Sequence, residues 1–148
     1  MPLPLPALHH VGLVVEDITA AAADYERRWN VTAGPVHDLT FPQAHVHGER
    51  LDLSARYSFI DTGASQIELI QPVSEASPYT EFLEANGGDG VHHLAYFVDT
   101  IDDYLDQLRA AGEPVDLVLD AVVPGGGRFV YLDGLAHGPV VELIETPR

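Results

Sequence analysis

Residues 8–18 read Leu-His-His-Val-Gly-Leu-Val-Val-Glu-Asp-Ile, and residues 91–101 read Val-His-His-Leu-Ala-Tyr-Phe-Val-Asp-Thr-Ile. Each copy is followed by a second echo, Ile67-Glu68-Leu69-Ile70 in the first half and Val141-Glu142-Leu143-Ile144 in the second. Each half therefore carries one His-His pair at the start of an apolar strand and one Glu inside an apolar strand. Repetition on this scale indicates a fold built from two similar units.

The first half predicts a strand, a helix and then further strands. A strand over residues 9–15 is followed by a helix over residues 18–30, where four consecutive alanines favour helix. Residues 36–50 carry three histidines, and we expect an irregular segment there. The segments 56–61 and 66–71 then predict two strands.

The second half repeats this order. A strand over residues 91–98 precedes a helix over residues 100–111 with one apolar stripe, and three strands follow. We therefore predict an α+β fold in which two paired βαβββ modules form a curled mixed sheet around a cleft. The chain would be a single domain, with module 1 at about residues 8–72, a connector at about 73–90 and module 2 at about 91–146.

The second histidine of each pair is the better candidate to face the cleft. Side chains alternate between the two faces of a strand, so His10 shares a face with Gly12, and His93 shares a face with Ala95. These small neighbours leave room on that face, whereas the opposite faces are bulky enough to pack under a helix. We therefore choose His10 and His93 as the inward-facing pair.

The glutamates of the two repeated strand motifs are also expected to face the cleft. Glu68 and Glu142 each stand between two apolar residues that face the helices. A carboxylate in so apolar a strand needs a cation, a hydrogen-bond partner or water. Two imidazoles and two carboxylates, repeated in register, suit a divalent first-row ion, so we predict a metal-binding cleft whose ligands are His10, Glu68, His93 and Glu142. The ligand types do not select among Zn, Ni, Co, Mn and Fe.

The composition excludes several partners. Seven arginines, no lysine and 23 acids give a net charge of −16, which argues against nucleic acid and anionic membranes as partners. The chain has no cysteine, so thiolate metal sites and disulfides are excluded. The N-terminus has no basic region typical of a signal peptide, and no apolar run has membrane-spanning length. We expect a cytoplasmic protein that binds a small molecule.

With these motifs the chain resembles the vicinal oxygen chelate superfamily, which includes glyoxalase I, bleomycin-resistance proteins and extradiol dioxygenases. The resemblance extends from Leu8 to Glu145. Two further stretches are similar to methylmalonyl-CoA epimerases: Ser77-Pro78-Tyr79-Thr80-Glu81-Phe82-Leu83, and Gly90-Val91-His92-His93 at the opening of the second module. The His-Glu-His-Glu set also resembles that of bacterial glyoxalase I enzymes. In the superfamily, the second His of each pair and the Glu of each strand hold the metal, which implies the same four ligands.

The resemblance implies an enzyme, a divalent-metal-dependent isomerase, epimerase or glyoxalase-type lyase. Such an enzyme moves a proton next to a metal-chelated carbonyl through an enolate. The glyoxalase-like case makes Glu142 the base. The epimerases use a glutamate on an earlier strand, and Asp52 falls near that place. In the epimerase-like case the base would therefore be Asp52, Glu49, His45 or His47. The shorter Asp52 is a departure from the epimerase pattern.

Other residues and other classes stay open at this level. We name four candidate substrate contacts: His45, His47, Phe97 and Arg128. A homodimer is expected, although the modules could pair within one chain or between two. The alternatives are a ring-cleaving dioxygenase and a metal-free small-molecule or antibiotic-binding protein of the same fold.

Overall fold

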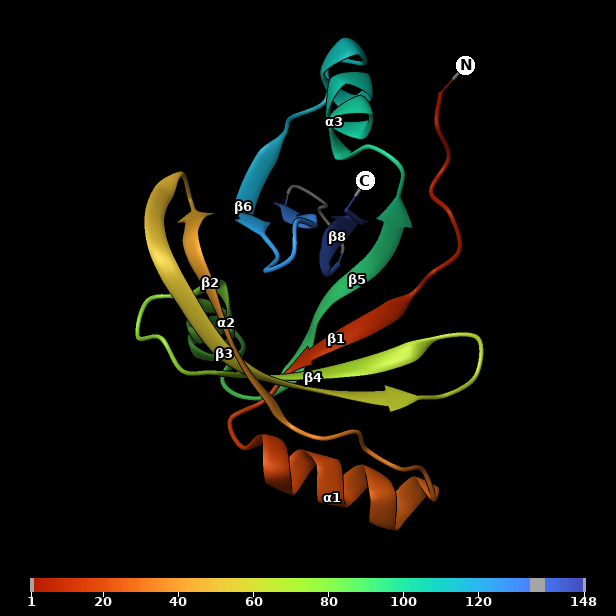
Figure 1. Cartoon of the computed structure of the whole chain (residues 1–148), viewed down its shortest axis with the longest axis vertical. Helices are drawn as coiled ribbons and strands as arrows, with labels where there is room; N and C mark the ends of the chain where they lie inside the picture. Colours follow the sequence, from red (N-terminus) through yellow and green to blue (C-terminus); the bar gives the residue numbers. More distant parts are fainter. Residues whose placement is uncertain (1, 134–137, 148) are drawn as a thin grey trace.

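The structure is a computed structural model that describes residues 2–133 and 138–147. Its elements follow the order β-α-β-β-β twice, with one additional helix between the halves (Figure 1). The first half and the linking helix comprise β1 (His10–Val14), α1 (Ile18–Trp29), β2 (His37–Val46), β3 (Glu49–Asp61), β4 (Gln66–Pro72) and α2 (Pro78–Asn86). The second half comprises β5 (Gly90–Val98), α3 (Ile101–Ala110), β6 (Asp116–Val122), β7 (Arg128–Asp133) and β8 (Val140–Glu145). The α+β prediction of two βαβββ modules is confirmed.

The strands close into one barrel. Their order around it is β1-β4-β3-β2-β6-β7-β8-β5, so the halves meet at two seams, β1 with β5 and β2 with β6. Both seams are antiparallel, whereas β1 pairs parallel with β4, and β5 pairs parallel with β8. Because both modules supply the wall, the interior belongs to neither module alone.

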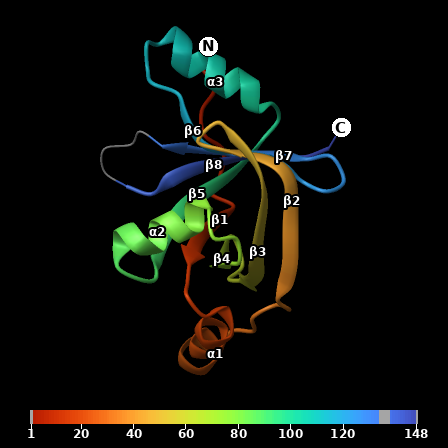
Figure 2. The same cartoon turned by 90° about the vertical axis from the view of Figure 1, so that its left-hand side faces the viewer.

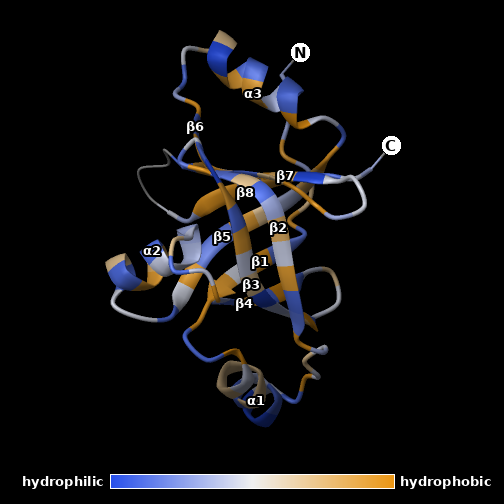
Figure 3. Ribbon diagram, turned by 60° about the vertical axis from the view of Figure 1, so that its left-hand side comes forward, coloured by the Kyte–Doolittle hydropathy of each residue, from blue (hydrophilic) through white to orange (hydrophobic). Residues whose placement is uncertain are grey.

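The three helices of the described residues lie outside this barrel. Helices α1 and α3 lie at opposite ends of the molecule, and α2 lies beside the barrel between them (Figures 1 and 2). Asp17 caps α1, since its side chain accepts a hydrogen bond from the amide of Ala20 at 3.1 Å. Apolar and polar residues alternate along α3 (Figure 3). Its Ile101 and Leu105 are buried, and they belong to the same apolar cluster as Leu143 of β8.

Residues 37–46 form a strand where we expected an irregular segment. Strand β2 pairs with β3, but the register shifts between Phe41 and Ala44, and Gln43 has a φ of 58°. This bulge interrupts the alternation, so only Phe41, Ala44 and Val46 of the strand are buried. A strand with a bulge and few inward apolar residues leaves little period-2 signal in the sequence.

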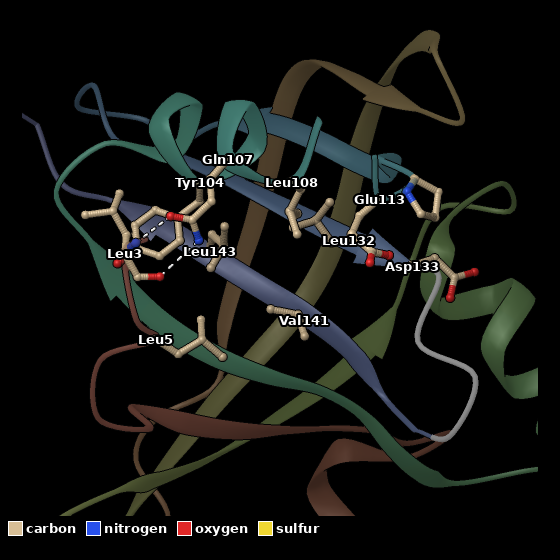
Figure 4. Close-up of a pocket in the computed structure, with 11 residues that line it drawn as sticks. Leu3, Leu5, Tyr104, Gln107, Leu108, Glu113, Leu132, Asp133, Val141 and Leu143 are labelled. Carbon is tan, nitrogen blue, oxygen red and sulfur yellow. Dashed lines mark hydrogen bonds between the residues drawn. The ribbon is translucent and has the colours of Figure 1, made fainter. Parts of the chain in front are cut away.

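The N-terminal segment is fastened to the outside of the second module. Tyr104 donates a hydrogen bond to the carbonyl of Pro4, and Gln107 exchanges hydrogen bonds with both backbone groups of Leu3. Between this segment, α3 and the outer face of β8 lies an apolar pocket of about 340 Å³ (Figure 4). Val141 and Leu143 point into it, whereas Glu142 points to the barrel interior. None of the helices in the described part of the chain has the length and hydropathy needed to span a bilayer.

Candidate metal centre

Strand register brings the repeated residues of the two halves together. Position 12 on β1 and position 95 on β5 both carry small residues. Each stands between two ligand-type residues on neighbouring strands: Gly12 between His93 and Glu68, and Ala95 between His10 and Glu142. The two half-sites therefore interleave across the β1–β5 seam, and each small residue leaves room for an imidazole.

The four side chains converge on one point inside the barrel. All four are buried, and one ligand atom of each lies within 4.8 Å of the others: His10, Glu68, His93 and Glu142. We call this set the His–Glu cluster. The two imidazole Nε2 atoms are 3.3 Å apart. The distance from His93 Nε2 is 3.0 Å to Glu142 Oε2 and 3.2 Å to Glu68 Oε1.

These separations suit a single ion among the four atoms. Nitrogen and oxygen ligands lie about 2.0–2.2 Å from a bound zinc ion, so neighbouring ligand atoms stand roughly 3.0–3.5 Å apart. In the His–Glu cluster the His10 Nε2 atom is 3.1 Å from Glu142 Oε2 and 3.5 Å from Glu68 Oε1. The side chains are therefore placed as ligands of one cation.

A second histidine orients each imidazole of the cluster. The Nδ1 atoms of His9 and His10 are 2.8 Å apart, and those of His92 and His93 are 2.9 Å apart. With Nδ1 engaged in this way, the Nε2 atom of each inner ring is directed at the cluster. Hydrogen bonds of this kind fix the ring orientation of metal-ligating histidines. The first histidine of each repeat thus positions the second.

The charges of the cluster balance. Burial disfavours the imidazolium form, but hydrogen bonds and charge interactions with both glutamates outweigh it and raise the pKa of His10 and of His93 to about 9. Burial would likewise raise the carboxyl values, yet the two histidines lower the pKa of Glu68 to about 2 and also lower the pKa of Glu142. Two protons thus neutralise two carboxylates, and a divalent cation would replace those protons without changing the net charge.

Three members of the cluster, His10, Glu68 and Glu142, line a central cavity of about 290 Å³. Apart from His9, members of the cluster and three tyrosines, its described lining is apolar: Leu39, Phe41, Phe59, Phe97, Val123, Pro124, Phe129 and Ile144. Leu39 and Phe97 are each 39% exposed, so they lie where the cavity opens to solvent. Tyr79, on α2, is fully buried and also lines the cavity.

The sequence did not reveal the tyrosines of this cavity. The hydroxyl of Tyr79 is 3.1 Å from that of Tyr57 and 2.8 Å from that of Tyr131. We call these three residues the tyrosine chain. Burial raises the pKa of each well above 10, so all three are neutral hydroxyls. The ring of Tyr131 also stacks on His93, with centroids 5.0 Å apart.

The candidate acids from the earlier strand lie outside the cavity. Asp52 is exposed on β3, and its carboxylate accepts a hydrogen bond from the amide of Gln43 at 3.0 Å. Glu49 is exposed at the start of the same strand. Inward-facing residues of β3 include Tyr57 and Phe59, which lie an odd number of positions from Asp52. Alternation therefore directs Asp52 away from the His–Glu cluster, and neither acid is in contact with it.

The candidate substrate contacts are dispersed. Phe97 lines the central cavity. Arg128 instead pairs with Asp120 at 3.0 Å and with Asp102 at 2.9 Å. His47 is exposed and bonds Glu81 of α2 at 2.8 Å. These contacts account for Arg128 and His47 without a substrate.

His45, the fourth candidate substrate contact, lies in a neighbouring pocket. His45 and Arg50 pair across β2 and β3 and line this pocket. Val123 and Pro124 line both this pocket and the central cavity. His45 is therefore next to the cavity and outside it.

Comparison with known proteins agrees with this architecture. Residues 9–132 match the family model described as Glyoxalase/Bleomycin resistance protein/Dioxygenase superfamily. The ethylmalonyl-CoA/methylmalonyl-CoA epimerase of Cereibacter sphaeroides is 34% identical over 108 residues, which cover 73% of this chain and 72% of that protein. Human mitochondrial methylmalonyl-CoA epimerase is 31% identical over 71% of this chain, and the match spans about half, 53%, of the human protein.

Solved structures of similar proteins share the whole fold. Methylmalonyl-CoA epimerase from Mycobacterium tuberculosis superposes with a TM-score of 0.70 at 25% identity, covering 97% of this chain and 89% of that chain. A variant of the Streptomyces coelicolor enzyme in complex with 2-nitronate-propionyl-CoA gives a TM-score of 0.70 at 23% identity, covering 98% of this chain and 100% of that chain.

Proposed function

We propose that this chain, which belongs to the Glyoxalase/Bleomycin resistance protein/Dioxygenase superfamily, is a divalent-metal-dependent epimerase of 2-substituted malonyl thioesters. Its relatives named as ethylmalonyl-CoA and methylmalonyl-CoA epimerases support this reaction class. One structural observation carries the proposal most directly: four buried ligand-type side chains meet within 4.8 Å inside a cavity of about 290 Å³. The homodimer and the cytoplasmic location stay predictions.

In the proposed reaction, the cluster holds the cation and one of its carboxylates handles the proton. When bound, a divalent cation supplies positive charge beside a substrate oxygen and thereby stabilises an enolate. His10, Glu68 and His93 hold the ion. Glu142 accepts the proton from the carbon beside the carbonyl, and its lowered pKa keeps it in the carboxylate form needed for this step at neutral pH.

Epimerisation also requires that a proton return to the opposite face of that carbon. Glu68 is the second carboxylate of the cavity, and it comes from β4 of the first half, whereas Glu142 comes from β8 of the second half. In our proposal, Glu142 removes the proton at one face of that carbon, and Glu68, when it carries a proton taken from solvent and is not binding the ion, returns a proton at the opposite face. Among the described lining residues, no other carboxylate is within the cavity.

A coenzyme A thioester requires a place for an anionic carrier on a chain of net charge −16. Four of the arginines are paired with acids: Arg27, Arg56, Arg109 and Arg128. Arg50 has no acid within salt-bridge distance among the described residues, and with His45 it lines the pocket next to the cavity. We propose that carrier phosphates lie along this pocket, while the acyl group enters past Leu39 and Phe97.

A stereochemical assay with metal control tests this function. Metal-stripped protein is loaded separately with Zn, Ni, Co or Mn and given a single stereoisomer of methylmalonyl-CoA or ethylmalonyl-CoA. We expect conversion to the mixture of both isomers only with metal-loaded protein. Equal conversion by stripped and loaded protein would refute metal dependence, and no conversion with any metal would refute the epimerase.

A glyoxalase-type lyase is the second candidate. It is favoured by one observation, that Asp52 lies outside the cavity, so the base must be a carboxylate of the cluster itself. The same metal-loaded preparations, given a hemithioacetal in place of the malonyl thioester, distinguish the two reactions. Oxygen uptake with a catechol panel tests the ring-cleaving alternative.

A further inference from the structure

The tyrosine chain contains one more hydroxyl proton than its own hydrogen bonds use. Three hydroxyls carry three protons, but Tyr57, Tyr79 and Tyr131 form only two hydrogen bonds with one another. No further hydrogen bond of these hydroxyls occurs among the described residues. One hydroxyl therefore holds a proton that it can donate elsewhere: that of Tyr57 or Tyr131 when Tyr79 donates to the other, or that of Tyr79 when it accepts from both.

The burial of the three residues indicates which hydroxyl holds the spare proton. A buried donor that is left unpaired is costly, so the more deeply buried hydroxyls should donate within the tyrosine chain. All three tyrosines line the cavity, but Tyr57 is the least buried, at 4% exposed, compared with 1% for Tyr131 and 0% for Tyr79. Tyr131 then donates to Tyr79, and Tyr79 donates to Tyr57. The remaining proton, on Tyr57, is directed into the central cavity.

The cavity wall offers a substrate few other hydrogen-bond donors. Among the described residues that line the cavity there is no arginine or lysine, and most of the wall is apolar. Outside the His–Glu cluster, a substrate oxygen would find polar groups only at His9 and at the tyrosine chain. A single neutral donor at Tyr57 would satisfy such an oxygen.

We propose that the Tyr57 hydroxyl donates a hydrogen bond to an anionic oxygen of the substrate, and that the tyrosine chain thereby selects thioesters that carry a carboxylate on the reacting carbon. The inference rests on the proposed epimerase function and identifies its specificity-determining residue. Tyr79 and Tyr131 are positioning residues, because they direct the Tyr57 proton without being its donor.

Two variants isolate the Tyr57 hydroxyl from the other two hydroxyls of the tyrosine chain. Tyr79→Phe/Tyr131→Phe retains only the Tyr57 hydroxyl, and Tyr57→Phe/Tyr79→Phe/Tyr131→Phe removes that hydroxyl as well. Replacing hydrogen-bonded partners together by apolar rings of the same shape is nearly neutral for folding. Any difference in binding between these two variants therefore reports on the Tyr57 hydroxyl.

The probes are 2-nitronate-propionyl-CoA, whose acyl group carries an anionic nitronate, and propionyl-CoA, whose acyl group carries no charge. With zinc-loaded protein we expect the triple variant to bind the nitronate about 10- to 100-fold more weakly than the double variant, as for loss of a hydrogen bond to a charged group. Propionyl-CoA should bind both variants equally, and zinc content should be equal. Tyr57→Phe alone should show the same loss relative to the unmodified chain.

The outcomes separate the two claims. Equal nitronate binding by the double and triple variants would overturn the role of Tyr57 while leaving the epimerase proposal intact. A matching loss of propionyl-CoA binding would also overturn it, because that result indicates a packing effect. If the unmodified chain neither binds the nitronate nor epimerises a malonyl thioester, the function itself has failed.

Discussion

Gly12 lies directly opposite His93 across the seam between the two halves, and this contact leaves no space for a side chain. A Cβ atom at position 12 would lie 2.0 Å from Cε1 of the His93 ring. The His93 ring, a candidate metal ligand from the second repeat, therefore requires glycine at position 12 in the first repeat.

Substituting Gly12 should consequently destroy the centre. We expect Gly12→Ala to displace the His93 ring, with loss of bound metal and loss of at least about 100-fold in kcat/KM, in the range of a positioned catalytic group. Gly138→Ala is the matched control, because a Cβ there has no atom within 4 Å. Metal analysis and kinetics of the two variants measure the effect, and normal zinc content in Gly12→Ala would contradict it.

Substitution of Glu142 and of Asp52 should have different effects on catalysis, because only Glu142 lies in the cavity. Glu142→Gln should lower kcat by about 10²- to 10⁴-fold, the usual contribution of general acid–base catalysis. Asp52→Asn should stay within about threefold of the unmodified chain, because its partner is the Gln43 amide. Steady-state kinetics at saturating metal measure both, and the reverse ranking would return the base to the earlier strand.

Metal affinity should increase with pH. Because the pKa values of His10 and His93 in the metal-free chain are raised to about 9, these histidines stabilise the metal-free fold fully below pH 6.5. This stabilisation is lost as the pH rises through about 9. A cation must displace both protons, so its apparent affinity should rise by up to about 100-fold per pH unit below that value and then level off.

Calorimetry of zinc binding in buffers of different ionisation enthalpy measures this linkage. Approximately two protons should be released per ion at pH 7. Zinc binding without proton release, or a zinc affinity that is constant between pH 6.5 and 8.5, would show that His10 and His93 are not both protonated in the metal-free chain.

Arg50 offers a test of the anionic carrier. Arg50→Gln should raise KM for a coenzyme A thioester by about 3- to 10-fold at low salt, with kcat unchanged and the difference shrinking as ionic strength rises. Arg28→Gln is the matched control, because Arg28 is an exposed arginine on α1 outside the cavity lining. Equal KM values for the two variants would place the carrier elsewhere.

The four residues of the His–Glu cluster were easier to predict from the sequence than the residues around them. Strand alternation around two repeated motifs was sufficient to bring His10, Glu68, His93 and Glu142 together, because alternation is a local property. The outward direction of Asp52 was not predictable, because β3 begins at Glu49, seven residues before the predicted strand. The position of Tyr79 depends on how α2 packs against the barrel, which no local pattern encodes.

Deuterium incorporation tests the central claim most directly. A single stereoisomer of methylmalonyl-CoA or ethylmalonyl-CoA is incubated in D₂O with the metal-loaded chain, and the label at the carbon between the two carbonyl groups is followed by mass spectrometry at early times. We predict incorporation well above the uncatalysed rate, abolished by chelation, restored by a divalent ion and lost in Glu142→Gln. Incorporation no faster than in the absence of protein, or unaffected by removal of the metal, would contradict proton transfer at a metal centre.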